Sequence, residues 1–552
     1  QPDGLTAVDV ERHPAQHPPA AEALSKAAYY DQWLGFHPYY IVVAGADTLA
    51  SGPGRVISVP SASSTGPHAM KIALLDAWWP VISSVVATVV ALLAATHAML
   101  NKRDTRSATG RTAVILMVPF VGALLYYVLG INRISRVAAR VRGGMRRYEH
   151  AGGTPVTLAE LERQLPAGAT HLIKIGRALD RTTRRPLMSG NRVTMLRDGD
   201  EAYPEMLRGI ASAKRSIALL SYIFDNDAAG QTFVDALSAA RTRGVEVRVL
   251  LDDAGARYSR PTIDNALRRG DVRVARFLPV WRPWLLEFAN LRNHRKILVI
   301  DGTIGFTGGI NIRQQCLVAQ SPRDPTRDLH FRLDGPVVAQ LSEVFAEDWT
   351  FATGEALSGD AWFPDVAPAG AVSARAISDG PDHDLDCTRW ALHAALASAR
   401  RSVRVVTPYF LPDEPLVTAL NIAALRGVTV DVVIPERGNL WIVNWAMRGE
   451  LWKVLRHGCR VWLTPPPFDH SKAMVVDEAW SLIGSANWDP RSLRLNFELG
   501  VECYDPAVAA VLDGFVAERI SVSRLLDPSE LSTESWPMRV RNGAARLLTP
   551  YL

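Results

Sequence analysis

The chain contains the stretch NHRKILVIDGTIGFTGGIN at residues 293–311, and a second stretch, DHSKAMVVDEAWSLIGSAN at residues 469–487, repeats its pattern. Both stretches have a histidine, a lysine two positions later and an aspartate five positions after the lysine. Only eight of the 61 basic residues are lysines, so a lysine at the same place in both copies points to a shared role. The paired residues are His294, Lys296 and Asp301 in the first copy, and His470, Lys472 and Asp477 in the second.

The repetition extends upstream of both motifs. ASAKRSI at residues 211–217 corresponds to ASARRSV at residues 397–403, and each is followed by a β-like run, a helical stretch and a second strand pattern. The second strands begin after the RGV sequences at Arg243 and Arg426. We therefore predict an α/β protein made of two pseudo-symmetric halves, each containing a β-α-β unit.

The motif spacing predicts a single site shared by the halves. Residues two apart on a strand point to the same side, so the histidine and lysine of each copy should face one spot. If the halves pack about a pseudo-two-fold axis, two imidazoles and two ammonium groups surround a site that can hold a phosphate diester. We expect six further residues to bind its oxygens through close backbone approach and side-chain donors: Gly308, Gly309, Asn311, Gly484, Ser485 and Asn487.

Each motif residue also has a purely structural interpretation. A single strand histidine is usually a hydrogen-bonded structural residue, but two at equivalent places beside rare lysines favour catalysis. Asp301 and Asp477 fall at predicted strand ends, where a turn role is an equal alternative. No carboxylate cluster with metal-ligand spacing accompanies the motifs, so we expect no metal or other cofactor, with lysine charge acting where Mg²⁺ acts in many phosphoryl-transfer enzymes.

Composition sets the class of protein. The 552 residues exceed the size of one ordinary domain, and 48% hydrophobic against 21% charged residues excludes a disordered chain. The four cysteines have no CxxC spacing, which argues against a zinc site or a disulfide framework.

The apolar residues are concentrated near the start of the chain. Residues 77–100 and 112–131 carry no formal charge, and each run is long enough to cross a bilayer as a helix. We predict a transmembrane hairpin within residues 70–131, the alternative being two buried core helices. Residues 1–69 show no sustained periodicity and precede a candidate start at Met70, so we expect a disordered or non-native extension.

A basic segment follows the second predicted span. Residues 132–147 contain six arginines and no acidic residue, which suits an anionic leaflet and favours a cytoplasmic catalytic portion. The loop between the two predicted spans is also basic, however, and by the same rule it would be cytoplasmic, which places the catalytic portion on the other side of the membrane. We describe residues 132–195 as a juxtamembrane segment and linker.

The duplicated HxKxxxxD motif with GGxN or GSxN downstream resembles the phospholipase D superfamily. The two N-terminal spans, RNHRK at residues 292–296, RDLHFRLDGPVV from Arg327 and NWDPRSLRLNFE at residues 487–498 narrow the resemblance to bacterial cardiolipin synthases. The similarity covers roughly residues 72–552. It implies two phospholipase D-like α-β-α sandwich halves, at residues 196–365 and 366–552, the second with a C-terminal tail.

The resemblance also implies a reaction. One histidine attacks the phosphorus of phosphatidylglycerol to give a phosphatidyl-histidine, and the other protonates the departing glycerol and then activates a second phosphatidylglycerol. Members of the superfamily tend to use the N-terminal motif histidine as the nucleophile, which here is His294. The resemblance also implies that Asp328 orients His470 and that Glu498 orients His294. The implied partners are phosphatidylglycerol and anionic membrane lipid, without nucleic acid, in the bacterial plasma (inner) membrane as a multi-pass protein.

Several points stay open at this stage. Aromatic and aliphatic residues near both motifs suit either a contact with the bilayer or the core: Trp281, Trp284, Leu285, Leu286, Phe288, Trp441, Trp445 and Trp452. A hydrolytic phospholipase D, a superfamily nuclease and a non-enzymatic membrane scaffold are the competing functions. Oligomeric state, and whether phosphatidylethanolamine can replace one phosphatidylglycerol, are not decided by the sequence.

Overall fold

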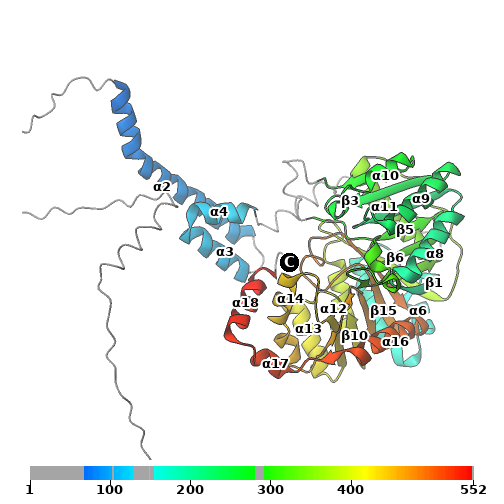
Figure 1. Ribbon diagram of the computed structural model, residues 1–552. Helices are drawn as coiled ribbons and strands as arrows, with labels where there is room; N and C mark the ends of the chain where they lie inside the picture. Colours follow the sequence, from blue (N-terminus) through cyan, green and yellow to red (C-terminus); the bar gives the residue numbers. More distant parts are fainter. Residues whose placement is uncertain (1–66, 102–104, 129–147, 149–154, 280–290, 550–552) are drawn as a thin grey trace, which may run out of the picture. The chain divides into compact units, whose positions relative to one another are not determined.

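The structure is a computed structural model that describes residues 67–101, 105–128, 148, 155–279 and 291–549. Its first elements are the helices α2 (Pro67–Asn101), α3 (Thr105–Met117) and α4 (Pro119–Val128), drawn in blue in Figure 1. Residues 1–66 of the predicted extension (residues 1–69) and the arginine-rich segment at residues 132–147 lie outside the described residues, whereas residues 67–69 belong to α2.

The two predicted membrane spans differ in the structure. Within α2, Trp78–Asn101 is the one described helix that is long and apolar enough to cross a membrane. The second apolar run instead forms α3 and α4, which are separated at Val118 because Pro119 has no amide hydrogen to continue the helical ladder. A two-helix transmembrane hairpin is therefore not confirmed.

Small residues pack α2 against the two shorter helices. Ala91, Ala95 and Ala98 are buried together with Ile115 of α3, and His97 Nδ1 lies 2.9 Å from the Tyr126 hydroxyl of α4. Such alanine contacts allow close approach of helices.

The α/β region is built on one continuous sheet of 15 strands. From one edge to the other the order is β17-β12-β11-β10-β14-β15-β16-β9-β1-β8-β6-β5-β2-β3-β4. Outward from β1, the strands of the first half follow the order β1-β8-β6-β5-β2-β3-β4. Outward from β9, the second half follows the equivalent order β9-β16-β15-β14-β10-β11-β12 and ends with the extra strand β17. Antiparallel pairing of β1 with β9 joins the halves, and the prediction of two pseudo-symmetric α/β halves is confirmed.

The strand bounds follow the repeat. In the first half they are β1 (Met188–Arg197), β2 (Ser216–Ser221), β3 (Glu246–Asp252), β4 (Arg273–Phe277), β5 (Ile297–Ile300), β6 (Ile304–Gly308) and β8 (Leu329–Asp334). In the second half they are β9 (Val372–Asp379), β10 (Ser402–Val406), β11 (Thr429–Pro435), β12 (Arg460–Thr464), β14 (Ala473–Val476), β15 (Trp480–Gly484), β16 (Glu498–Tyr504) and β17 (Arg524–Leu525). Two further strands, β7 (Thr326–Arg327) and β13 (Phe468–Asp469), pair in parallel with each other across the halves.

Helices cover both faces of the sheet (Figure 1). The first half contains α8 (Asp198–Ser212), α9 (Ala228–Thr242), α10 (Asp264–Arg269) and α11 (Val337–Thr353). The second half contains α12 (Cys387–Ser398), α13 (Glu414–Leu425), α14 (Trp441–Arg448), α15 (Trp452–Leu455), α16 (Pro506–Val522), α17 (Pro528–Ser532) and α18 (Trp536–Leu547).

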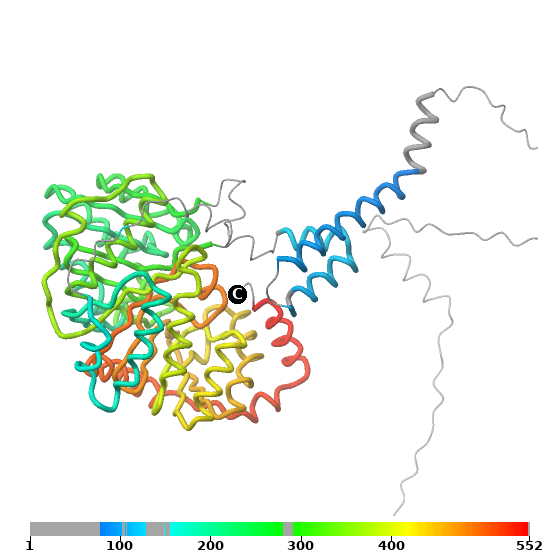
Figure 2. The backbone as a smooth tube through the Cα atoms, turned by 180° about the vertical axis from the view of Figure 1, so that it is seen from behind, coloured from blue at the N-terminus to red at the C-terminus, as the bar shows by residue number. Residues whose placement is uncertain are grey.

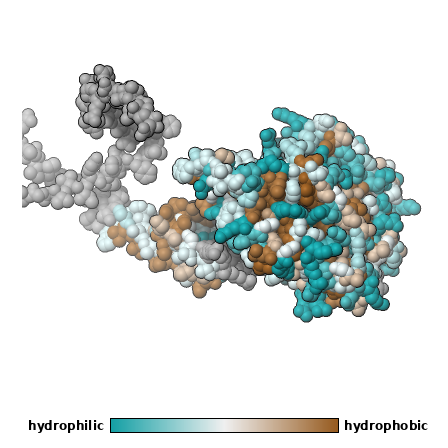
Figure 3. Space-filling view, turned by 90° about the horizontal axis from the view of Figure 1, so that it is seen from below, coloured by the Kyte–Doolittle hydropathy of each residue, from teal (hydrophilic) through white to brown (hydrophobic). Residues whose placement is uncertain are grey.

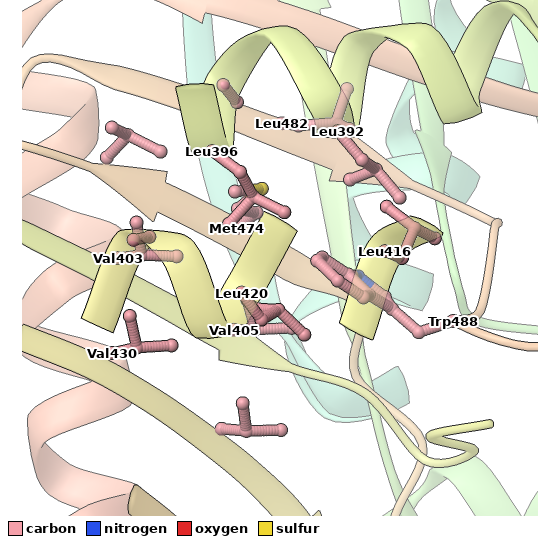
Figure 4. Close-up of a cluster of buried hydrophobic side chains, with 14 of the residues drawn as sticks. Leu392, Leu396, Val403, Val405, Leu416, Leu420, Val430, Met474, Leu482 and Trp488 are labelled. Atoms are coloured by element: carbon pink, nitrogen blue, oxygen red, sulfur yellow. The ribbon is translucent and has the colours of Figure 1, made fainter. Parts of the chain in front are cut away.

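Successive side chains of each strand point to opposite faces of the sheet and pack against different layers of helices. In β2, Ile217 and Leu219 share one core with α8 and α9, whereas Ala218 and Leu220 share another with α11. Figure 4 shows the corresponding packing in the second half, where Val403 and Val405 of β10 meet leucines of α12 and α13. Each half is thus an α-β-α sandwich.

Part of the predicted linker is folded. The helices α6 (Leu158–Gln164) and α7 (Ile173–Thr182) contribute leucines and isoleucines to the core of the second half, and Figure 2 shows this cyan segment beside it. Strand β1 begins at Met188, upstream of the expected boundary at residue 196. The sequence repeat did not predict β1 because it starts at residues 211 and 397, downstream of β1 and of its counterpart β9.

Candidate active site

A cavity of about 560 Å³ opens between the two halves. His294 and Lys296 line it from the first half, and His470 and Lys472 line it from the second. The structure therefore brings together the two histidines and two lysines that the repeat singled out.

Each histidine is anchored by the backbone of the opposite half. The His294 amide donates to Phe497 O at 2.9 Å, and the His470 amide donates to Arg327 O at 2.7 Å. The motif histidine and lysine lie in extended segments just before β5 and β14, not inside strands as expected, because these segments pair with the opposite half. Their side chains still reach the same cavity.

A carboxylate from the opposite half faces each imidazole. His470 Nδ1 lies 2.7 Å from Asp328 Oδ2, and His294 Nδ1 lies 3.4 Å from Glu498 Oε1. Asn496 places its amide nitrogen 3.1 Å from both His294 Nδ1 and Glu498 Oε1. With Nδ1 occupied in this way, Nε2 of each ring is the nitrogen available for chemistry.

The two histidine–carboxylate pairs differ in proton affinity. Burial lowers the pKa of His294 to about 4, although Glu498 opposes this shift, and it lowers the pKa of His470 well below the usual value. Burial raises the pKa of Asp328 to about 6. Burial acts on Glu498 in the same sense, but contacts with His294, Lys296 and Ser485 outweigh it and leave the pKa of Glu498 lowered. The Asp328–His470 pair therefore takes up a proton closer to neutral pH than the Glu498–His294 pair.

The lysines are buried beside their own histidines. Lys296 Nζ donates to His294 O at 2.5 Å, and Lys472 Nζ donates to His470 O and lies 2.9 Å from His470 Nδ1. Burial lowers the pKa of both ammonium groups, to about 8 for Lys472. Two cationic side chains thus line the cavity, where they can attract an anionic phosphate.

The residues expected to bind phosphate fall into two groups. Asn311, Ser485 and Asn487 line the cavity. Gly308, Gly309 and Gly484 do not; they pack against β16, which begins at Glu498, and against Asp328 and the start of β8. A Cβ on Gly309 would lie 2.2 Å from Asp328 Oδ1, and one on Gly484 would lie 2.3 Å from Leu499 O. These glycines allow β8 and β16 to approach closely enough to present Asp328 and Glu498.

The motif aspartates are not brought to the site. Asp301 accepts hydrogen bonds from the backbone amides of residues 214–216, and Asp477 accepts them from the amides of residues 400–402. Asp477 also contacts His171 Nε2 at 2.6 Å. Both aspartates have positive φ angles and lie at the far ends of β5 and β14 from the histidines. This geometry favours the turn interpretation of both aspartates, and their inclusion among the catalytic residues stays a prediction.

Sequence reasoning missed a buried arginine behind the first motif. The Arg295 guanidinium contacts Asp348 Oδ2 at 2.7 Å, Ser378 Oγ at 2.6 Å and Glu498 O at 3.0 Å. It therefore links Asp348 of the first half to Ser378 and the Glu498 carbonyl of the second half. The repeat does not identify it, because its counterpart there is Ser471, but it belongs to the RNHRK run that carries the family resemblance.

Three other side chains near the histidines were also missed. The Tyr222 ring centroid lies 4.1 Å from that of His294, and Asn496 and Arg491 line the same cavity. Asn496 and Arg491 belong to the NWDPRSLRLNFE stretch, so the family resemblance was the signal that could have identified them. Within the described ranges, no group of three or more His, Cys, Asp or Glu side chains is placed to hold a metal ion.

Part of the predicted aromatic surface can be located. Trp441 and Trp452 are exposed. Trp445 packs edge-to-face against Trp441, and the Arg541 guanidinium lies over the Trp445 ring. Hydrophobic side chains also reach the surface of the α/β region on the face drawn in Figure 3. The residues expected between Trp281 and Phe288 lie outside the described residues.

Comparison with known proteins agrees with this geometry. Residues 206–349 and 392–518 match a family described as "Cardiolipin synthase, PLD-like domain". The chain is 32% identical over 470 residues to Cardiolipin synthase A of Pseudomonas entomophila (strain L48), covering 84% of this chain and 96% of the relative. It is 29% identical over 470 residues to Cardiolipin synthase 1 of Bacillus cereus, covering 82% and 90% of the two chains. In fold it is similar to the phosphatidylserine synthase of Haemophilus influenzae Rd KW20, with a TM-score of 0.52, 16% identity, and coverage of 69% of this chain and 100% of the other.

Proposed function

Because the chain belongs to the bacterial cardiolipin synthase family of the phospholipase D superfamily and is a phospholipid phosphatidyltransferase, we propose that it converts two phosphatidylglycerol molecules into cardiolipin and glycerol. The observation that carries this proposal is the pair of histidine–carboxylate contacts, each made across the two halves and both facing one cavity. A transfer that proceeds in two steps needs one nucleophile and one acid–base group at a single phosphorus.

In the first step His294 acts as the nucleophile. Its Nε2 forms a bond to the phosphorus of phosphatidylglycerol while the bond from phosphorus to the glycerol oxygen breaks, and His470 gives that oxygen a proton. In the second step His470 takes the proton from a hydroxyl of another phosphatidylglycerol. The resulting oxygen–phosphorus bond replaces the bond to His294, giving cardiolipin and restoring both rings.

The difference in proton affinity supports this assignment. A nucleophile must be unprotonated, which suits the low pKa of His294 beside Glu498. An acid–base group needs a proton affinity closer to neutral, which suits the Asp328–His470 pair. In this proposal Glu498 and Asp328 orient the two rings.

The remaining cavity residues position the phosphate. Lys296 and Lys472 offset its negative charge and the charge that develops during transfer. Asn311 and Asn487 supply side-chain amide donors to its oxygens, whereas Ser485 donates its hydroxyl hydrogen to Glu498 Oε2 at 2.5 Å and so holds that carboxylate. Gly308, Gly309 and Gly484 act indirectly by allowing the close approach of the segments that contain Asp328 and Glu498. The substrates place the reaction at a membrane, and we keep the multi-pass topology and cytoplasmic catalytic portion as proposals.

The pH dependence of donor consumption follows from these pKa shifts. Protonation of His294 stops its attack, so kcat/KM should fall as pH drops through about 4. Loss of the proton shared by Asp328 and His470 removes the acid, so kcat/KM should also fall as pH rises through about 6. Glycerol release measured at low phosphatidylglycerol across this range should give a bell-shaped curve.

The Asp328→Asn variant tests which group sets the upper limb. Without this carboxylate, His470 loses the partner that favours its protonated form, so the upper limb should move to lower pH. An upper limb that stays in place in D328N would contradict the assignment of Asp328 and His470.

Thin-layer analysis of lipids tests the function itself. The full chain in phosphatidylglycerol vesicles with excess EDTA is expected to form cardiolipin and release glycerol, because lysines occupy the place where a divalent cation would act. Phosphatidic acid as the main product would identify a hydrolase. An unchanged lipid composition together with DNA cleavage would identify a nuclease, and activity restored only by Mg²⁺ would contradict the role given to Lys296 and Lys472.

A further inference from the structure

The catalytic cavity contains an arginine that the repeat does not duplicate. Arg491 lies 21 residues after His470, and the residue 21 positions after His294 is Gln315. The other arginine of the cavity, Arg313, corresponds by the same count to Asp489. The lysines of the two halves thus form a symmetric pair, whereas Arg491 breaks the symmetry.

Arg491 lies within electrostatic reach of Asp489 in the same cavity but is not paired with it. Arg313 Nε lies 3.1 Å from Asp225 Oδ2 and donates to Gln315 at 2.7 Å. In the part of the chain that the structure describes, Arg491 forms no ion pair, and its Nε is enclosed without a hydrogen-bond partner. An enclosed cationic donor without an acceptor is costly, so an anionic ligand would be favoured there.

The position of Arg491 is fixed relative to the nucleophile. The amides of Leu495 and Asn496 both donate to Arg491 O at 2.9 Å, which holds it at the start of a tight turn. The turn ends at Asn496, whose side chain contacts His294 Nδ1 at 3.1 Å. The positive charge of Arg491 also contributes to lowering the pKa of His294, so the two groups are electrostatic neighbours.

We propose that Arg491 binds the phosphate of the acceptor phospholipid and thereby selects a phosphodiester-bearing alcohol over water or a neutral alcohol. This inference rests on the proposed function. The attacking hydroxyl is joined to its own phosphate by a short glycerol chain, so that second phosphate must enter the same cavity. The symmetric histidines and lysines surround the phosphorus being transferred. The acceptor's own phosphate needs one further binding group that the repeat does not supply twice. Arg491 is such a single residue, and its planar guanidinium can donate two hydrogen bonds to one phosphate.

Competition between two acceptors tests this site. The full chain in phosphatidylglycerol vesicles containing ethanol should form both cardiolipin and phosphatidylethanol from one phosphatidyl-enzyme, with total glycerol release reporting the first step. Arg491→Gln is expected to lower the ratio of cardiolipin to phosphatidylethanol by about 10- to 100-fold. Total glycerol release should fall by a smaller factor than this ratio, because ethanol still discharges the phosphatidyl-enzyme. Arg491→Lys keeps the charge without the fork and should give an intermediate ratio.

Arg494 provides the matched control. It lies on the same turn but is exposed and outside the cavity lining, so Arg494→Gln should leave the ratio unchanged. An unchanged ratio in R491Q would overturn the inference. So would a loss of glycerol release by both folded Arg491 variants, because it would place the residue at the donor step. A wild-type chain that releases no glycerol would overturn the proposed function as well, which separates the two failures.

Discussion

Replacing His294 by asparagine is expected to reduce cardiolipin formation at least ~10⁴-fold, because the chain then lacks the nitrogen that bonds to phosphorus. Asparagine keeps an amide near Glu498 and Asn496, so the surroundings of the ring should remain folded. The loss should appear in kcat, measured by glycerol release from phosphatidylglycerol vesicles.

His457 offers a matched control for this substitution. It is exposed and lies outside the catalytic cavity, so His457→Asn should leave the rate unchanged. A folded H294N variant that keeps more than about a tenth of the wild-type rate would show that the ring does not act as the nucleophile.

Replacing Arg295 by methionine is expected to lower the free energy of unfolding by about 3–5 kcal/mol. The substitution leaves the buried Asp348 carboxylate without its cation and removes the hydrogen bonds to Ser378 and Glu498 that join the halves. Thermal unfolding of the purified full chain in detergent should show a lower midpoint. Activity should fall too, because Glu498 loses its backbone anchor.

An exposed ion pair supplies the comparison. Arg197 Nη1 contacts Glu518 Oε2 at 2.7 Å, but both side chains are more than a third exposed, so Arg197→Met should cost less than about 1 kcal/mol. Equal shifts of the unfolding midpoint in R295M and R197M would contradict the view that Arg295 holds the two halves together.

The internal repeat made the central architecture predictable. The equal spacing after His294 and His470 indicated two α/β halves, and the β-α-β units fall where the RGV strands suggested. Repeat spacing works here because each half contributes the same segment to a shared cavity.

Other features depend on contacts between segments far apart in the chain. The sequence could not show that Asp301 and Asp477 bind backbone amides, since a strand-end aspartate serves turns and active sites alike. Nor could it show that residues 158–182 pack on the second half. The second apolar run has the composition of a span, but Pro119 divides it into two short helices.

Intact-protein mass spectrometry after exposure to phosphatidylglycerol tests the central claim most directly. In His470→Asn the acceptor hydroxyl cannot be activated efficiently, so the chain should accumulate the added mass of one phosphatidyl group. The His294→Asn chain, treated in the same way, should gain no mass. An adduct found on H294N and absent from H470N would contradict the account by making His470 the nucleophile.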